Sequence, residues 1–105
     1  MLAILAAAAV VSTPVEVEMR CVVGGAHLSF RQGERSLSAD AKPGETVVVD
    51  TIAWTATAKP VFALKPTQYG YRAVGAPGDK PQSAVLDCSS ADAPPMRLRS
   101  QFPAG

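Results

Sequence analysis

The chain has 105 residues, 48% of them hydrophobic, and its ten basic and nine acidic residues leave a net charge of +1. This near balance argues against a nucleic acid or another polyanion held by a long-range electrostatic field. The length suffices for one small domain, and the hydrophobic content without long charge blocks excludes a chain that is disordered by composition.

The N-terminal residues have the composition of a signal peptide. Residues Leu2–Val11 form an uncharged apolar run, which is shorter than the roughly 20 apolar residues that span a bilayer but long enough for a signal-peptide core. No Lys or Arg precedes the run, so the alternative is an N-terminal strand or short buried helix of a cytosolic domain. We expect a signal peptide at residues 1–12, a single all-β domain at residues 13–105, and no transmembrane segment in the mature chain.

A β-hairpin is predicted directly after this segment. Residues Val15–Val23 alternate between apolar and mostly charged side chains, which is the period of a strand with one buried face. Gly24 and Gly25 then provide the positive φ angles that a primed two-residue turn requires. Residues Ala26–Arg31 form the returning strand.

A two-residue turn at the glycines also predicts how the two strands pair. All inward partners are then apolar, and the outward partners include one pair of opposite charge. The expected pairs are Val23 with Ala26, Cys21 with Leu28, Met19 with Phe30, Arg20 with Ser29, and Glu18 with Arg31.

The rest of the chain reads as short strands separated by turns. The expected strands are Ser36–Ala41, Thr46–Thr57, Val61–Leu64, Tyr69–Ala73, Ala84–Cys88 and Met96–Phe102. Pro43 and Gly44 predict a type II turn, and the glycine- and proline-rich residues Gly75–Pro81 predict a loop. The valines of Thr46–Thr57 indicate a central strand covered on both faces, with Trp54 in the core.

This pattern indicates an all-β fold, a small antiparallel β-sandwich or β-barrel of about seven to eight short strands. A tryptophan between two distant cysteines is superficially similar to an immunoglobulin-type sandwich. However, Trp54 comes too late in the chain, and Leu86 stands where that family has its corner tyrosine. The sequence therefore indicates the architecture and not that family.

Cys21 and Cys88 are the two cysteines of the chain, and each lies on the apolar side of its strand. In an exported protein this predicts a disulfide that clamps the first hairpin to the penultimate strand. A zinc site needs more nitrogen and sulfur ligands than these cysteines and the single histidine provide. We therefore expect no metal and no cofactor.

The candidates for catalysis are few. Glu16 and Glu18 lie two residues apart on one strand face, a spacing of about 7 Å that suits a carboxylate pair. On an exposed face, however, a pairing of Glu18 with Arg31 is the simpler interpretation. His27 is expected to be an exposed residue near the turn, and nothing in the sequence supplies the buried acid of a catalytic triad.

Two groups of residues are candidates for binding a partner. Arg20, Arg31, Arg97 and Arg99 are all expected to face outward, and they form one basic stripe if the last strand lies beside the first hairpin. The alternative is that they keep a β-surface soluble. Tyr69 and Tyr71 form the second group, and their alternative is an ordinary place in a half-buried strand.

Taken together, these features predict a periplasmic or secreted binding module with no enzymatic activity. Its partner is expected to be another envelope or extracellular protein, with this chain serving as an accessory subunit or as an enzyme inhibitor. The alternative is a small hydrolase that uses the carboxylate pair.

Overall fold

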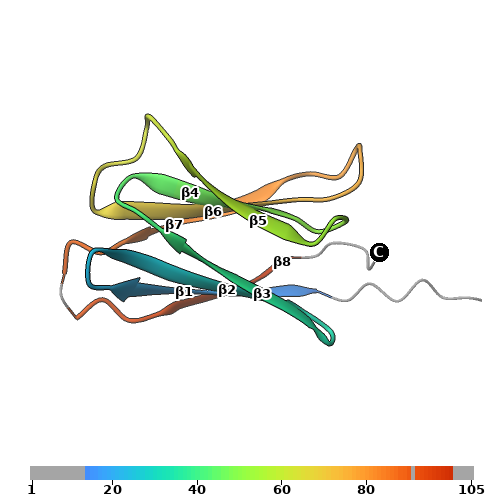
Figure 1. Cartoon of the computed structure of the whole chain (residues 1–105), viewed down its shortest axis with the longest axis horizontal. Helices are drawn as coiled ribbons and strands as arrows, with labels where there is room; N and C mark the ends of the chain where they lie inside the picture. Colours follow the sequence, from blue (N-terminus) through green and yellow to red (C-terminus); the bar gives the residue numbers. More distant parts are fainter. Residues whose placement is uncertain (1–13, 91, 101–105) are drawn as a thin grey trace, which may run out of the picture.

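The computed structural model describes residues 14–90 and 92–100, and within them all regular structure is β-strand. Two four-stranded sheets lie face to face (Figure 1), so the expected all-β architecture is confirmed as a sandwich. The signal peptide expected at residues 1–12 lies outside the described residues. The strands are β1 (Val15–Val22), β2 (Gly25–Gln32), β3 (Arg35–Ala41), β4 (Glu45–Asp50), β5 (Thr55–Pro60), β6 (Gln68–Val74), β7 (Gln82–Asp87) and β8 (Met96–Ser100).

The strand order differs from a simple meander. Sheet A has the order β3-β2-β1-β8 and sheet B the order β5-β4-β6-β7. All neighbours are antiparallel except β4 and β6, so the antiparallel sandwich that the sequence predicts contains one parallel pair. Because β5 returns the chain to the end where β4 starts, β6 begins at that same end and runs parallel to β4 (Figure 1).

The hairpin of β1 and β2 has the predicted faces but a different register. Cys21 lies opposite Ala26 instead of Leu28, and Glu18 lies opposite Ser29 instead of Arg31. The shift is two residues, which exchanges partners but leaves every residue within the two strands on its expected face. Cys21 therefore still points toward sheet B. Val23, expected to pair with Ala26 on the inner face, lies in the turn and is fully exposed.

The turn accounts for this shift. The two turn residues are Val23 and Gly24, not the two glycines, and of these only Gly24 has a positive φ, at 81°. This combination is typical of a type II turn and not of a primed turn. Gly25 belongs to β2, where a Cβ atom would collide with the backbone carbonyl of Ala41 in the neighbouring strand β3.

The run Thr46–Thr57 is not one central strand. It forms the hairpin of β4 and β5, and the Asp50 carboxylate accepts hydrogen bonds from the backbone N–H groups of Ile52 (2.9 Å) and Ala53 (3.0 Å). The Asp50 carbonyl accepts a third bond from the N–H of Trp54, whose φ is +58°. An aspartate that bonds the backbone ahead of it favours a turn over a continuing strand.

Residues Val61–Leu64 form a loop, and the strand predicted there is wrong. β5 already ends at Pro60, and the N–H of Val61 donates to the carbonyl of Gly44. The N–H of Leu64 then donates to the carbonyl of Val61, which reverses the chain. The type II turn expected at Pro43 and Gly44 is present, with a φ of 78° at Gly44.

The core lies between the two sheets. Its buried apolar residues are Val15, Val17, Met19, Ala26, Leu28, Phe30, Ala41, Val47, Val49, Tyr69, Tyr71, Ala73 and Leu86. Trp54 is only half buried at its margin, with the Arg35 guanidinium 4.4 Å from the ring centroid. Its indole Nε1 is buried and has no hydrogen-bond partner among the described residues.

A disulfide joins the two sheets, as predicted. Cys21 of β1 is bonded to Cys88, which directly follows β7, and their Cα atoms are 5.8 Å apart. The N–H of Cys88 also donates to the carbonyl of Thr67, which anchors this end of the bridge. A disulfide suggests an oxidising environment outside the cytoplasm. The described part of the chain contains no helix that could cross a membrane.

Candidate functional site

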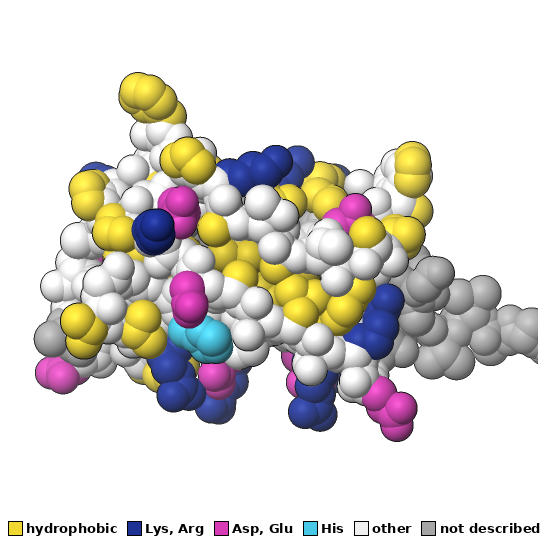
Figure 2. Space-filling view, viewed as in Figure 1, with side chains coloured by type: hydrophobic (Ala, Val, Ile, Leu, Met, Phe, Trp, Pro, Cys, Tyr) yellow, Lys and Arg dark blue, Asp and Glu magenta, His cyan; other side chains and the backbone are white. Residues whose placement is uncertain are grey.

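The four candidate arginines lie on one surface. β8 is the neighbour of β1 in sheet A, and Arg20, Arg31, Arg97 and Arg99 all project from the outer side of that sheet and are exposed. Figure 2 shows the corresponding basic and acidic side chains along the lower side of the molecule. We call this surface the arginine face; it comprises Glu16, Glu18, Arg20, Ser29, Arg31, Arg97 and Arg99.

The arginine face is not the purely basic stripe that was predicted. The pairing of β1 with β8 places Glu18 opposite Arg97 and Glu16 opposite Arg99. Glu18 accepts from Arg97 Nε at 2.9 Å and from Arg20 Nη2 at 3.2 Å. The four arginines and two glutamates nevertheless leave an excess of two positive charges on this face.

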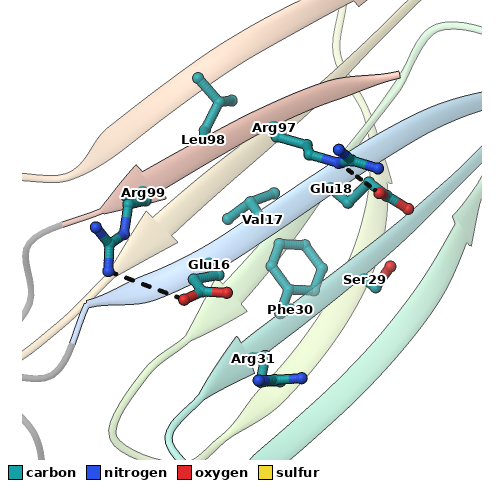
Figure 3. A pocket seen from close by; sticks show the side chains of 9 residues that line it. All are labelled: Glu16, Val17, Glu18, Ser29, Phe30, Arg31, Arg97, Leu98 and Arg99. Atoms are coloured by element: carbon teal, nitrogen blue, oxygen red, sulfur yellow. Dashed lines mark hydrogen bonds and ion pairs between the residues drawn. The ribbon is translucent and has the colours of Figure 1, made fainter. Parts of the chain in front are cut away.

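Two of the arginines, Arg99 and Arg31, are only weakly bound to the acidic side chains of this face. The Nη2 atom of Arg99 lies 3.9 Å from Glu16 Oε1, which is longer than a hydrogen bond. Arg31 lies opposite Glu16 across β1 and β2 but forms no ion pair within residues 14–90 and 92–100. Figure 3 shows the Glu16 side chain between these two arginines. Both guanidiniums can therefore accept a further anionic group.

A shallow open depression of about 570 Å³ lies at the centre of this face. Residues of β1, β2 and β8 line it, among them Ser29, Arg31 and Arg99 (Figure 3). It opens to solvent over three neighbouring strands of one sheet and does not enclose its contents. Such a surface suits a docked protein segment better than a small molecule, because small-molecule sites bury most of the ligand.

One member of the carboxylate pair, Glu18, is held in its ionised form. The hydrogen bond from Arg97 is the largest cause that lowers the pKa of Glu18 below its usual range, and the charge of Arg20 acts in the same direction. General acid catalysis by a glutamate needs the opposite shift, a raised pKa. This arrangement therefore does not favour general acid catalysis by Glu18.

His27 lies in β2 and not in the turn. Its Nδ1 is 2.7 Å from the Asp40 carboxylate of β3, and both side chains are solvent-accessible on the outer side of sheet A. Within the described residues no serine is hydrogen-bonded to His27, and no group of three or more acidic, His or Cys side chains is arranged to hold a metal.

Tyr69 and Tyr71 are not surface residues, so the hypothesis that they contact a partner is wrong. Their exposed fractions are 5% and 3%, because β6 lies inside sheet B between β4 and β7 and both side chains point inward. The Tyr71 ring packs against Phe30 of sheet A with centroids 6.3 Å apart. The alternation of these tyrosines marked the core face of the strand.

The sequence interpretation paired Glu18 with Arg31 and did not connect the two glutamates with Arg97 and Arg99. The structure joins them, because the spacing of Glu16 and Glu18 matches that of Arg99 and Arg97 across the pair of β1 and β8. This match of alternating opposite charges was the signal in the sequence for that strand pairing. Sequence reasoning also missed the fully exposed Val23 and Phe62, which lie in the turn after β1 and the loop after β5.

The fold and the site define a disulfide-linked β-sandwich with a charged outer face on one sheet. Comparison of the chain with protein-family models, with curated proteins and with solved structures found no match in any of the three. The assignment of function therefore rests on the residues of this chain.

The bond between Glu18 and Arg97 makes stability depend on acidity. Because folding lowers the pKa of Glu18, its contribution is present above the ordinary glutamate pKa near 4.5 and is lost as the pH falls through the lower value of the folded state. The melting temperature of the wild type should exceed that of an Arg97→Ala variant at neutral pH, and the difference should vanish under strongly acidic conditions. The difference should also be absent in a Glu18→Gln background; its persistence there would contradict the assignment to this pair.

Proposed function

We propose that the protein is an exported binding module without enzymatic activity, which acts in the periplasm or outside the cell. The observation that carries the proposal is the arginine face, where three of the four exposed arginines, Arg31, Arg97 and Arg99, line a shallow depression and the four arginines leave an excess positive charge. Arginine forks bind carboxylates with two parallel hydrogen bonds. The expected partner is another envelope or extracellular protein that presents acidic side chains.

The disulfide supports action outside the cytoplasm. Bonds of this type persist in oxidising compartments and are rare in the reducing cytosol. The apolar segment Leu2–Val11 supports export independently, because it has the length and composition of a signal-peptide core. The two lines of support come from different parts of the chain.

The alternative, a small hydrolase, receives less support. Its carboxylate pair would need a concave pocket that separates the two pKa values. Glu16 and Glu18 line the depression of the arginine face, but it is shallow and open, and each carboxylate has an arginine of β8 within 4 Å. An accessory subunit and an enzyme inhibitor are both compatible with the arginine face, and recovery of one enzyme in stoichiometric complex would favour the inhibitor.

Replacing Arg97 and Arg99 together by Ala should slow association with the partner and weaken its dependence on salt. The reason is that charged groups at the rim of an interface mainly accelerate encounter, and salt screens them. Folding should change little, because ion pairs between exposed side chains contribute little to stability. Association rates at two salt concentrations, measured by surface plasmon resonance with partner captured from an extracytoplasmic extract, give the comparison.

The matched control is Arg72→Ala, which removes an exposed arginine from β6 on the outer side of sheet B. This variant should associate like the wild type. Equal association of the double variant and the wild type would remove the arginine face from the proposal and return these residues to a role in solubility.

A further inference from the structure

β8 is an edge strand with a free side. In sheet A it pairs with β1 on one side, and the described residues place no strand on the other. Backbone N–H and C=O groups on such an edge can pair with a further strand. The strand order of sheet A places β8 at one edge and β3 at the opposite edge.

Among the described residues, the closest contacts between strands of the two sheets lie on the side of β3. At the far edge β3 contacts both β4 and β5, so sheet B covers that side of the core. Met96 and Leu98 of β8 point inward and pack against the core, but both remain only half buried. A strand added beside β8 would cover these two side chains.

Charge determines which strand β8 can accept. Opposed residues of an antiparallel pair lie on the same face, so pairing β8 with β8 of a second copy would place arginine opposite arginine on the outer face. Like charges in directly opposed positions are destabilising. This edge therefore disfavours a second copy of the chain.

The chain itself shows a sequence that β8 accepts. On its paired side, β1 supplies the alternation Val15-Glu16-Val17-Glu18-Met19, with the glutamates opposite Arg99 and Arg97 and the apolar residues opposite Leu98 and Met96. The guanidiniums also retain unused donors, because Arg97 bonds to Glu18 through Nε alone. A second acidic strand can use the remaining N–H groups.

We propose that the free edge of β8 binds an extended segment of a partner protein in which acidic and apolar residues alternate. Its carboxylates lie beside Arg97 and Arg99, its apolar side chains cover Met96 and Leu98, and its backbone extends sheet A by one strand. This inference rests on the proposed function, which it deepens by naming the chemistry and conformation of the partner segment.

The probe is a capped peptide, Thr-Val-Glu-Val-Glu-Val-Thr, titrated into the isotope-labelled protein and followed by NMR. Amide signals of β8 should shift and exchange more slowly with solvent, while those of β5, an edge strand of sheet B, should not. A peptide with Lys in place of Glu should bind at least about tenfold more weakly. The Arg97→Ala, Arg99→Ala double variant should bind the original peptide about three- to tenfold more weakly, since opposed charge pairs contribute a fraction of a kcal/mol to one kcal/mol each.

Backbone methylation distinguishes an added strand from docking on the face. Successive N–H groups of a strand point to opposite edges, so a peptide N-methylated on its glutamates and one N-methylated on its valines present different edges to β8. One of the two should lose binding and the other should keep it.

If both methylated peptides bind equally well and their binding still depends on charge, strand addition would be overturned. The proposed function would stand in that case. Absence of peptide binding would also overturn the inference. Dimerisation of the wild type without peptide, accompanied by slower exchange of the β8 amides, would overturn the choice of occupant. If neither peptide binding nor association with the captured partner depends on charge, the result would instead contradict the proposed function.

Discussion

Replacing Cys21 and Cys88 together by Ser should lower the free energy of unfolding by about 2 to 5 kcal/mol. The bridge joins residues 67 positions apart and links β1 of sheet A to the end of β7 in sheet B. In the chain-entropy model, closing a loop of this length restricts the denatured state by roughly 4 kcal/mol. That amount is close to the whole net stability of many small domains, which begins near 5 kcal/mol.

Urea denaturation followed by the fluorescence of Trp54 measures this effect. Reduction of the wild type should reproduce the midpoint of the double variant, and reductant should leave the variant unchanged. If the oxidised wild type and the variant unfold at the same urea concentration, the disulfide does not hold the two sheets together.

Replacing Phe30 by Ala should lower the free energy of unfolding by about 3 to 5 kcal/mol. Phe30 is 1% exposed, and its ring packs against Tyr71 of the opposite sheet. The substitution therefore removes buried area and leaves a cavity at the contact between the sheets. The neighbouring Ser29→Ala change, on the outer side of the same strand, should remain within about 0.5 kcal/mol.

Chemical denaturation of the two variants under identical conditions provides the comparison. A loss below about 1 kcal/mol for Phe30→Ala would mean that the ring has no tightly packed environment. It would then contradict the packing of sheet A against sheet B through this residue.

Alternation in the sequence predicted which face of each strand is buried. It predicted less reliably which residues of neighbouring strands lie opposite one another. The hairpin of β1 and β2 is the clearest example, because a shift of two residues preserves the face of every residue within the two strands. The choice between the two registers depends on Gly25, whose need to lie close to Ala41 involves a third strand. A two-strand pattern contains no information about that contact.

Local chemistry that competes with β-propensity accounts for the error at Thr46–Thr57. The valines and threonines favour a strand, but three hydrogen bonds to Asp50 reverse the chain. The parallel pairing of β4 and β6 was beyond sequence reasoning, because it depends on which side of β4 the returning chain occupies.

The candidate site was predicted in part. The outward direction of the four arginines followed from alternation, and their meeting on one face required β8 to lie beside β1, as it does. The partial neutralisation by Glu16 and Glu18 follows from the register of that long-range pair. Tyr69 and Tyr71 were misassigned because the sequence did not show that β6 is an interior strand of its sheet.

The central claim, an exported sandwich clamped by one disulfide, is tested most directly by the intact mass of the protein recovered from an extracytoplasmic fraction. The account predicts a mature chain that begins between Ala8 and Val15 and is two hydrogen atoms lighter than the same chain after reduction. A chain that begins at Met1 and carries both cysteines as free thiols would contradict it.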